Sequence, residues 1–113
     1  MTTVEFRVAA TTNVEALAGA VAHAIRRGDG VDLVARGLRQ VGLAVVGVSL
    51  AREFLQEDGL GLTIDVQRVL LVFAPDAMAY GVKLALREGP LHGDSPAPIA
   101  ATAVAVGTVA TAQ

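Results

Sequence analysis

The polar groups best placed to do chemistry stand at two points where an extended segment gives way to a helix. Arg36, Gly37 and Arg39 surround the start of the second predicted helix. Free backbone N–H groups and the positive end of a helix dipole favour an anion there, and two guanidinium groups can hold phosphate oxygens. The turn before the first predicted helix carries Thr11, Thr12 and Asn13. Both turns follow neighbouring strands, so we expect them to share one edge and form a modest phosphate cradle.

An alternative interpretation of both turns needs no ligand. Thr12 and Glu15 have the T-x-x-E spacing of a capping box, so Thr12 can simply cap the first helix. The arginines can be ordinary solvated side chains. No aromatic residue stands near either turn in the sequence, and acidic residues outnumber basic ones by 11 to 9. A phosphate site and a plain helix cap both remain open at this point.

No group of residues has the make-up of a catalytic or metal site. His23 falls on the polar side of the first predicted helix and His92 lies in a Pro- and Gly-rich stretch, so the two do not form a metal site. Asp58 and Asp65 lack a paired-carboxylate spacing, and Ser49 has no nucleophile-elbow context. The absence of cysteine excludes thiolate chemistry and disulfides. We expect a protein that is not an enzyme and needs no cofactor or metal.

Charge and hydropathy restrict the possible partners. The formal charge is −2 and the pI is near 5.5, so nothing attracts nucleic acid or an anionic membrane overall, and any nucleic-acid site must be a local basic patch. Hydrophobic residues make up 53% and the mean hydropathy is +0.55, which leaves apolar surface for a partner. The sequence shows no signal peptide and no apolar run of the about 20 residues that span a bilayer. We expect a cytoplasmic protein with no membrane partner.

Periodicity predicts the order β-α-β-α for the first half of the chain. Alternating apolar residues over 4–9 indicate a half-buried strand. An apolar stripe from Val14 to Ile25 indicates a helix, which Gly28 ends. Residues 31–36 form the second predicted strand, Gly37 marks a tight turn, and residues 38–56 form the second predicted helix.

The second predicted helix is apolar on two opposite sides. One side carries Leu38, Val41, Val45, Val48 and Leu55. The other carries Leu43, Val46, Leu50 and Phe54. A helix that is apolar on two faces is buried on two faces, and a domain of this size is expected to cover only one. We therefore predict a dimer or higher oligomer with the second set in the contact between subunits.

The remaining sequence predicts two strands and a tail. Residues 62–73 form the third strand, and its broken alternation predicts either a bulge near Gln67–Arg68 or burial on both faces. Residues 78–87 form the fourth strand. Its inward side chains are predicted to be Tyr80, Val82, Leu84 and Leu86. Residues 1–88 then make one domain, and 89–113 make a Pro/Gly linker and a low-complexity Ala/Val/Thr tail. We interpret the tail as mobile, with an added strand or an assembly contact as alternatives.

The order β-α-β-α-β-β predicts an α/β fold of the α+β sandwich kind, a four-stranded mixed sheet with both helices on one face. Several strings in this order resemble the stage V sporulation protein S family of Alba-like domains. They are FRVA at 6–9, the turn at 11–13, ALAGAV at 16–21, RG at 27–28, ARG at 35–37 and AREF at 51–54. The register is free of gaps from Phe6 to Phe54, is looser to Arg87, and does not include the tail.

This resemblance implies an Alba-like fold, a dimer or higher assembly, and a nucleic-acid-binding or regulatory role in bacterial development. The chain departs from the family pattern at Gly42, Leu43 and Val46, which are small or apolar where the family tends to carry polar or basic residues. Two functions follow for the chain. One is a non-enzymatic, oligomeric regulator that binds DNA or RNA. The other is a structural or scaffolding protein that acts through homo-oligomeric self-assembly without nucleic acid.

Overall fold

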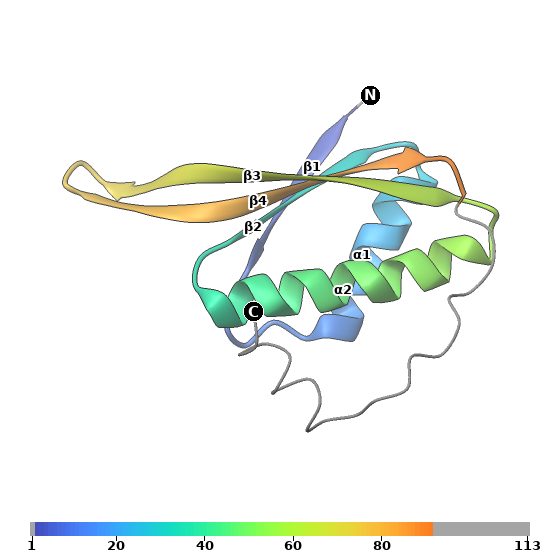
Figure 1. Ribbon diagram of the computed structural model, residues 1–113, viewed down its shortest axis with the longest axis horizontal. Helices are drawn as coiled ribbons and strands as arrows, with labels where there is room; N and C mark the ends of the chain where they lie inside the picture. Colours follow the sequence, from blue (N-terminus) through green and yellow to red (C-terminus); the bar gives the residue numbers. More distant parts are fainter. Residues whose placement is uncertain (1, 92–113) are drawn as a thin grey trace, which may run out of the picture.

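A computed structural model describes residues 2–91 of the 113-residue chain. Its elements are β1 (Thr3–Val8), α1 (Val14–Arg26), β2 (Gly30–Ala35), α2 (Leu38–Gln56), β3 (Gly61–Ala74) and β4 (Ala77–Gly89). The strands form one sheet in the order β1-β2-β4-β3, and both helices lie on one face of it (Figure 1). β1 and β2 are parallel and the other pairs are antiparallel. The predicted order, mixed sheet and Alba-like α+β arrangement are confirmed. The predicted tail falls within 92–113, outside the described residues.

α1 begins one residue later than the predicted capping box requires. Asn13 is the N-cap, and its Oδ1 accepts a hydrogen bond from the Ala16 N–H at 2.9 Å. The Thr12 hydroxyl instead accepts from the Ala9 N–H at 2.7 Å. The Thr12 N–H also donates to the Ala9 carbonyl at 3.1 Å. These two bonds draw Thr12 back toward β1, so the cap falls to Asn13, which caps a helix as well as threonine does.

The core lies between the helices and the inner face of the sheet, and it is built from aliphatic side chains. Within residues 2–91, no polar or charged residue is buried. Its largest fully buried members are Val21, Ile25, Val31, Leu33, Leu55, Leu62 and Leu86. Of the four aromatic residues, which all lie in this range, only Phe6 packs against the core, and it is half-buried.

α2 divides its apolar residues differently from the two predicted sides. Its buried residues are Ala44, Gly47, Val48, Ala51 and Leu55. Gly47 lies against Leu17 of α1, and Leu43 and Leu50, one turn on either side of Gly47, are half-buried against the core. Leu38, predicted to be buried, is 94% exposed. Part of the second apolar side is thus covered by α1 of the same subunit, a neighbour that the pattern of one helix does not reveal.

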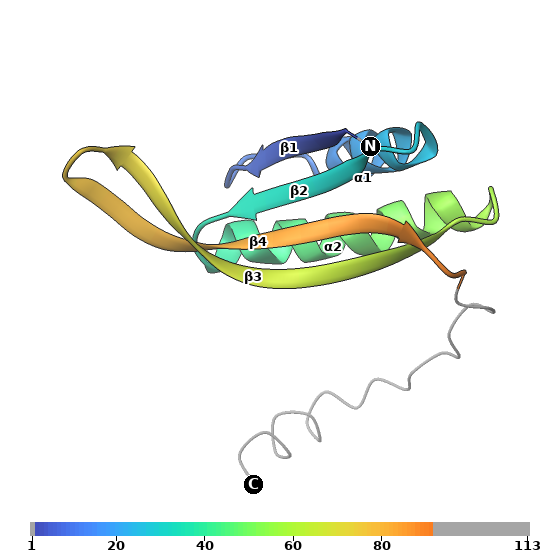
Figure 2. The same ribbon diagram turned by 90° about the horizontal axis from the view of Figure 1, so that it is seen from above.

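β3 and β4 form the longest pairing and project beyond the rest of the sheet as a hairpin arm, residues 69–80 (Figure 2). Their register is unbroken up to Val72, and the irregularity lies between Val72 and Ala74, not near Gln67–Arg68 as predicted. β3 is not buried on both faces either, because Val72 is 64% exposed and Leu70 is exposed as well. The uninterrupted apolar run at residues 69–73 lies in an arm that no helix covers.

The arm also overturns one predicted side-chain placement. Leu84 and Leu86 face the core as predicted, but Tyr80 is 58% exposed and Val82 is half-buried. β4 has 13 residues and extends past the end of the helices. Alternation along β4 correctly relates its side chains to one another, but it carries no information on where the cover by the helices ends.

Candidate nucleic-acid interface

Arg39 joins the two turns that the sequence singles out. It lies in the first turn of α2, and its Nε donates a hydrogen bond to the Ala10 carbonyl oxygen at 3.0 Å. Ala10 directly precedes the turn formed by Thr11, Thr12 and Asn13. β1 and β2 are adjacent and parallel, so the segments that follow them emerge at the same end of the sheet. The bond from Arg39 holds these segments side by side.

The N-terminus of α2 is open to an anion. Gly37 is its N-cap, with a φ of 90° and no side-chain cap. A Cβ at this position would lie 2.9 Å from the Gln40 Oε1 atom, in a backbone conformation that L residues rarely adopt. No acidic residue lies in the first turn of α2, whereas α1 carries Glu15 in its own first turn. The α2 end is therefore the more favourable of the two for a negative charge.

The polar side chains of the α1 turn are engaged with their own backbone. The Thr12 and Asn13 oxygens accept the bonds from Ala9 and Ala16 described above. Acceptance of these bonds leaves the hydroxyl proton of Thr12 and the amide hydrogens of Asn13 as donors. Thr11 is exposed at the same turn. The cap and the phosphate interpretations of this turn are thus compatible.

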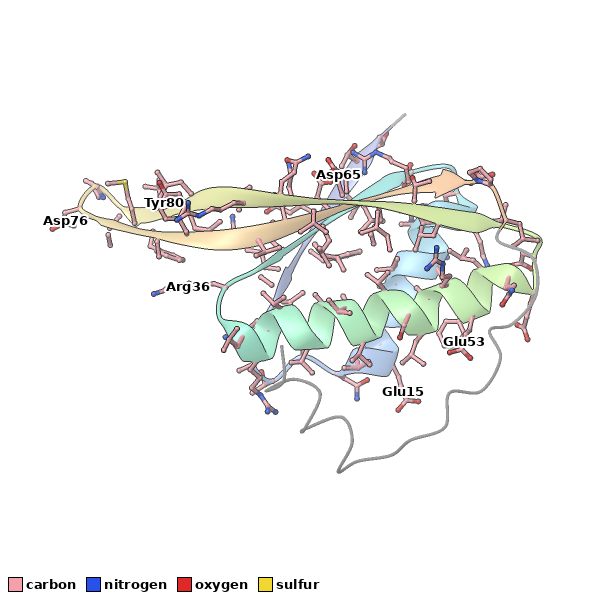
Figure 3. The ribbon with its side chains drawn as sticks, in the orientation of Figure 1. Glu15, Arg36, Glu53, Asp65, Asp76 and Tyr80 are labelled. Carbon is pink, nitrogen blue, oxygen red and sulfur yellow. The ribbon has the colours of Figure 1, made fainter. Side chains whose placement is uncertain are left out.

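Arg36 does not join Arg39. Its Cζ atom lies over the Phe73 ring, 4.9 Å from the ring centroid, and Figure 3 shows the side chain pointing from the end of β2 toward the hairpin arm. Such a contact between a guanidinium and an aromatic face is attractive. The two arginines predicted to hold phosphates are therefore separated, with Arg39 at the helix turns and Arg36 at the arm.

The arm contributes residues that sequence reasoning missed. Arg68 lies over the ring of Tyr80, with 3.7 Å from its Cζ to the centroid, and Phe73 is exposed. Arginine and aromatic faces on a projecting ribbon are a surface on which unstacked bases can stack. The interrupted alternation at Arg68 was a signal. Arg68 pairs with Val82, and this register places Tyr80 diagonally opposite Arg68. The sequence alone does not give the register, so it does not predict the contact between Arg68 and Tyr80.

Among residues 2–91, the arginines at this end of the molecule lack carboxylate partners, whereas four of the five elsewhere have one and the fifth, Arg52, donates to the Leu62 carbonyl. Carboxylates pair with four other arginines, in Arg7–Glu5, Arg26–Asp58, Arg27–Asp29 and Arg87–Asp32. In the described part of the chain, Arg36, Arg39 and Arg68 form no ion pair. Figure 1 shows the start of α2 and the hairpin arm at the same end of the molecule. Three arginines without an ion pair among the described residues are thus gathered there in a chain that is acidic overall, and Asp76 lies at the tip of the arm at the same end (Figure 3).

The predicted subunit-contact residues of α2 are only partly open. Val46 is 50% exposed and Phe54 is at the margin of exposure. Leu43 and Leu50 are half-buried in their own subunit. Val45, which the sequence placed on the buried side, is exposed next to Val46. The apolar surface that α2 leaves open therefore centres on Val45 and Val46.

Three further expectations concern the histidines, membrane-spanning helices and metal sites. His23 is exposed on α1, as predicted, and His92 lies outside the described residues. Between residues 2 and 91, no helix is long and apolar enough to span a bilayer. In the same range, no three His, Cys, Asp or Glu side chains gather where a metal ion could sit.

Comparison with known proteins identifies the family. A family model described as Stage V sporulation protein S (SpoVS) matches residues 4–67, which is more than half of the 113 residues. The matched stretch includes both helices and both turns, and it stops before the hairpin arm and β4. No curated protein matches the chain. The family match confirms the resemblance seen in the local strings, and the chain belongs to the stage V sporulation protein S family, a sporulation-related family.

Proposed function

We propose that this protein is a non-enzymatic, cytoplasmic regulator that binds nucleic acid and acts as a homo-oligomer. The observation that carries the proposal is the Arg39 bond to Ala10, because it builds one polar surface from two helix turns. Donors from both turns and an α2 N-terminus free of acidic residues lie on that surface. Backbone phosphates are the ligands that such groups hold.

The hairpin arm supports the same proposal with a different kind of contact. Phosphate contacts give affinity, and aromatic faces give stacking with bases. Arg36 with Phe73 and Arg68 with Tyr80 supply both on the arm. A nucleic-acid strand whose phosphates bind at the α2 turn and whose bases continue along the arm would contact Arg39, Arg36 and Arg68 together.

Titration of fluorescent single- and double-stranded DNA and RNA at several salt concentrations tests the proposal. Phosphate contacts make the logarithm of the affinity fall linearly with the logarithm of the salt concentration. Arg39→Ala should weaken binding and reduce that slope by about one. Arg27→Ala is the matched control, because it removes the same charge from an arginine already paired with Asp29. An absence of binding at low salt, or equal losses in both variants, would contradict the proposal.

The second candidate function is scaffolding through self-assembly without nucleic acid. The exposed Val45 and Val46 on α2 favour it, because burial of these adjacent apolar side chains against a second subunit lowers the free energy of the assembly. Light scattering of the wild type against Val46→Lys tests this candidate. A lower oligomeric state in the variant supports it. A wild-type monomer at micromolar concentration contradicts it.

The two candidate functions make separable demands on the molecule. Self-assembly depends on the surface at Val46, and nucleic-acid binding on the surface at Arg39. An oligomer that survives Arg39→Ala, and binding that weakens in Val46→Lys, would together show that assembly brings several weak sites onto one nucleic acid.

A further inference from the structure

The outer edge of β3 is a long strand edge that has no neighbouring strand among residues 2–91. β3 is the last strand in the order β1-β2-β4-β3 and has 14 residues, whereas β1, at the opposite edge, has 6. Unpaired N–H and C=O groups on such an edge are a template for another strand. Polar residues in the first half of β3 discourage foreign pairing, but 69–73 is entirely apolar. Natural proteins cover edges of this kind.

The core side of β3 is covered at Leu62 but open from Ile64 onward. Val66 and Ile64 pair with Leu84 and Leu86, which are buried in the core, so all four side chains lie on the same face of the sheet. Val66 is nevertheless 65% exposed and Ile64 is also exposed. A strand added beside β3 would place its own inward side chains next to these two residues and extend the core.

The chain itself is directed to this edge as it leaves β4. Pro90 and Leu91 cross directly over Gly61, and a side chain at position 61 would clash with the Pro90 carbonyl. Only glycine permits that crossing. Figure 2 shows the short orange segment that follows the β4 arrow crossing the beginning of β3 toward its outer side.

The sequence beyond this crossing has the composition of a strand. Residues 99–112, IAATAVAVGTVATA, contain no charged residue and no proline, and half of them are β-branched. The linker of residues 90–98 has nine residues and reaches about 30 Å when fully extended. β3 is about 45 Å long at the usual rise per residue. The linker therefore reaches the first half of β3 and not the tip of the arm.

We propose that residues 99–112 pair with the outer edge of β3 in the same chain as a fifth strand. The strand enters beside the beginning of β3 and runs toward the arm, so the pairing is parallel. It covers the open backbone edge of β3 and places alternate valine and alanine side chains beside Ile64 and Val66. The proposal does not depend on nucleic-acid binding.

Hydrogen exchange in the full chain tests the pairing. The β3 amides that point away from β4 should exchange at least about tenfold more slowly than in a variant whose tail cannot pair. That variant is Val104→Pro with Ala105→Pro, because one of two adjacent residues must direct its N–H toward β3, and proline has none. The control is Ser95→Pro with Ala97→Pro, which adds two prolines to a linker that already contains Pro96 and Pro98.

The outward β3 amides should be protected in the wild type and in the linker control. In the tail variant this protection should be lost. Equal exchange in the wild type and the tail variant would overturn the proposal. The Val21 amide in α1 reports whether each variant is folded. In a mixture of differently labelled chains, cross-strand contacts between the tail and β3 should arise within one chain. Contacts found only between chains would overturn the proposal in favour of an exchanged strand.

Discussion

Leu17 of α1 lies against Gly47 of α2 so closely that a Cβ at position 47 would come within 2.9 Å of the Leu17 Cδ2 atom. This contact sets how near the two helices approach and explains why a poor helix former stands in the middle of α2. It also accounts for part of the apolar surface that the α2 sequence presents on its second side, because the flank around Gly47 is occupied by α1.

Replacement of Gly47 by valine should destabilise the fold. The added methyl groups would displace the buried Leu17 side chain, and overpacking of this kind lowers the free energy of unfolding by about 1–3 kcal/mol. Chemical denaturation measures the loss. Gly42→Val on the same helix is the matched control, since a Cβ at position 42 has no atom within 4 Å. Equal stability of the two variants would show that the helices are not in close contact at Gly47.

The two residues of the α1 turn should respond differently to removal of their oxygens. Asn13→Ala removes the N-cap and should lower the free energy of unfolding by about 1 kcal/mol. Its local signature is faster hydrogen exchange at the Ala16 amide. Thr12→Val keeps the side-chain shape and should instead speed up exchange at the Ala9 amide, because that N–H loses its acceptor. Faster exchange of Ala16 in the Thr12 variant would restore threonine as the cap.

Gly37→Ala should disturb the start of α2. Its φ of 90° and ψ of 156° are in a region that only glycine occupies readily, and such strain costs about 1–3 kcal/mol. Thermal or chemical unfolding should show the loss, and nucleic-acid affinity should fall with it because the α2 N–H groups shift. Gly19→Ala is the control, because Gly19 lies in α1 with no atom within 4 Å of its Cβ position and alanine favours a helix. A loss in both variants would argue against strain at Gly37.

Tyr80→Leu should weaken binding of single-stranded nucleic acid more than binding of a duplex. Stacking of a base on an aromatic ring contributes about 1–3 kcal/mol, so the single-strand affinity should fall about fivefold or more, measured by fluorescence anisotropy. Met78→Leu, another exposed residue of the arm, is the matched control. Equal losses for single strands and duplexes would show that the arm binds through charge alone.

The order of the elements could be predicted from the sequence because their signals are local. The alternation of β1, the apolar stripe of α1 and the stop at Gly28 each depend on residues a few positions apart. The family strings support the same order, and the family match over residues 4–67 confirms the resemblance that they carry. The adjacency of the two turns also followed from local information, because two parallel strands end at one edge.

Features that depend on distant neighbours could not be predicted in the same way. The placement of Tyr80 failed because the position where the helices stop covering β4 is a property of the whole packing. The direction of Arg36 depends on Phe73, which comes 37 positions later in the chain. The half-burial of Leu43 and Leu50 depends on α1, whose position beside Gly47 cannot be read from the α2 sequence alone.

The placement of Tyr80 has a practical consequence for work with this protein. The chain has one tyrosine and no tryptophan, so its intrinsic fluorescence comes almost entirely from a ring on the projecting arm, beneath the Arg68 guanidinium. Unfolding of the aliphatic core would change that emission mainly through loss of the arginine contact. A ligand that inserts between Arg68 and Tyr80 would change the tyrosine emission while the fold stays intact. The tyrosine fluorescence of the unmodified protein therefore reports directly on the arm.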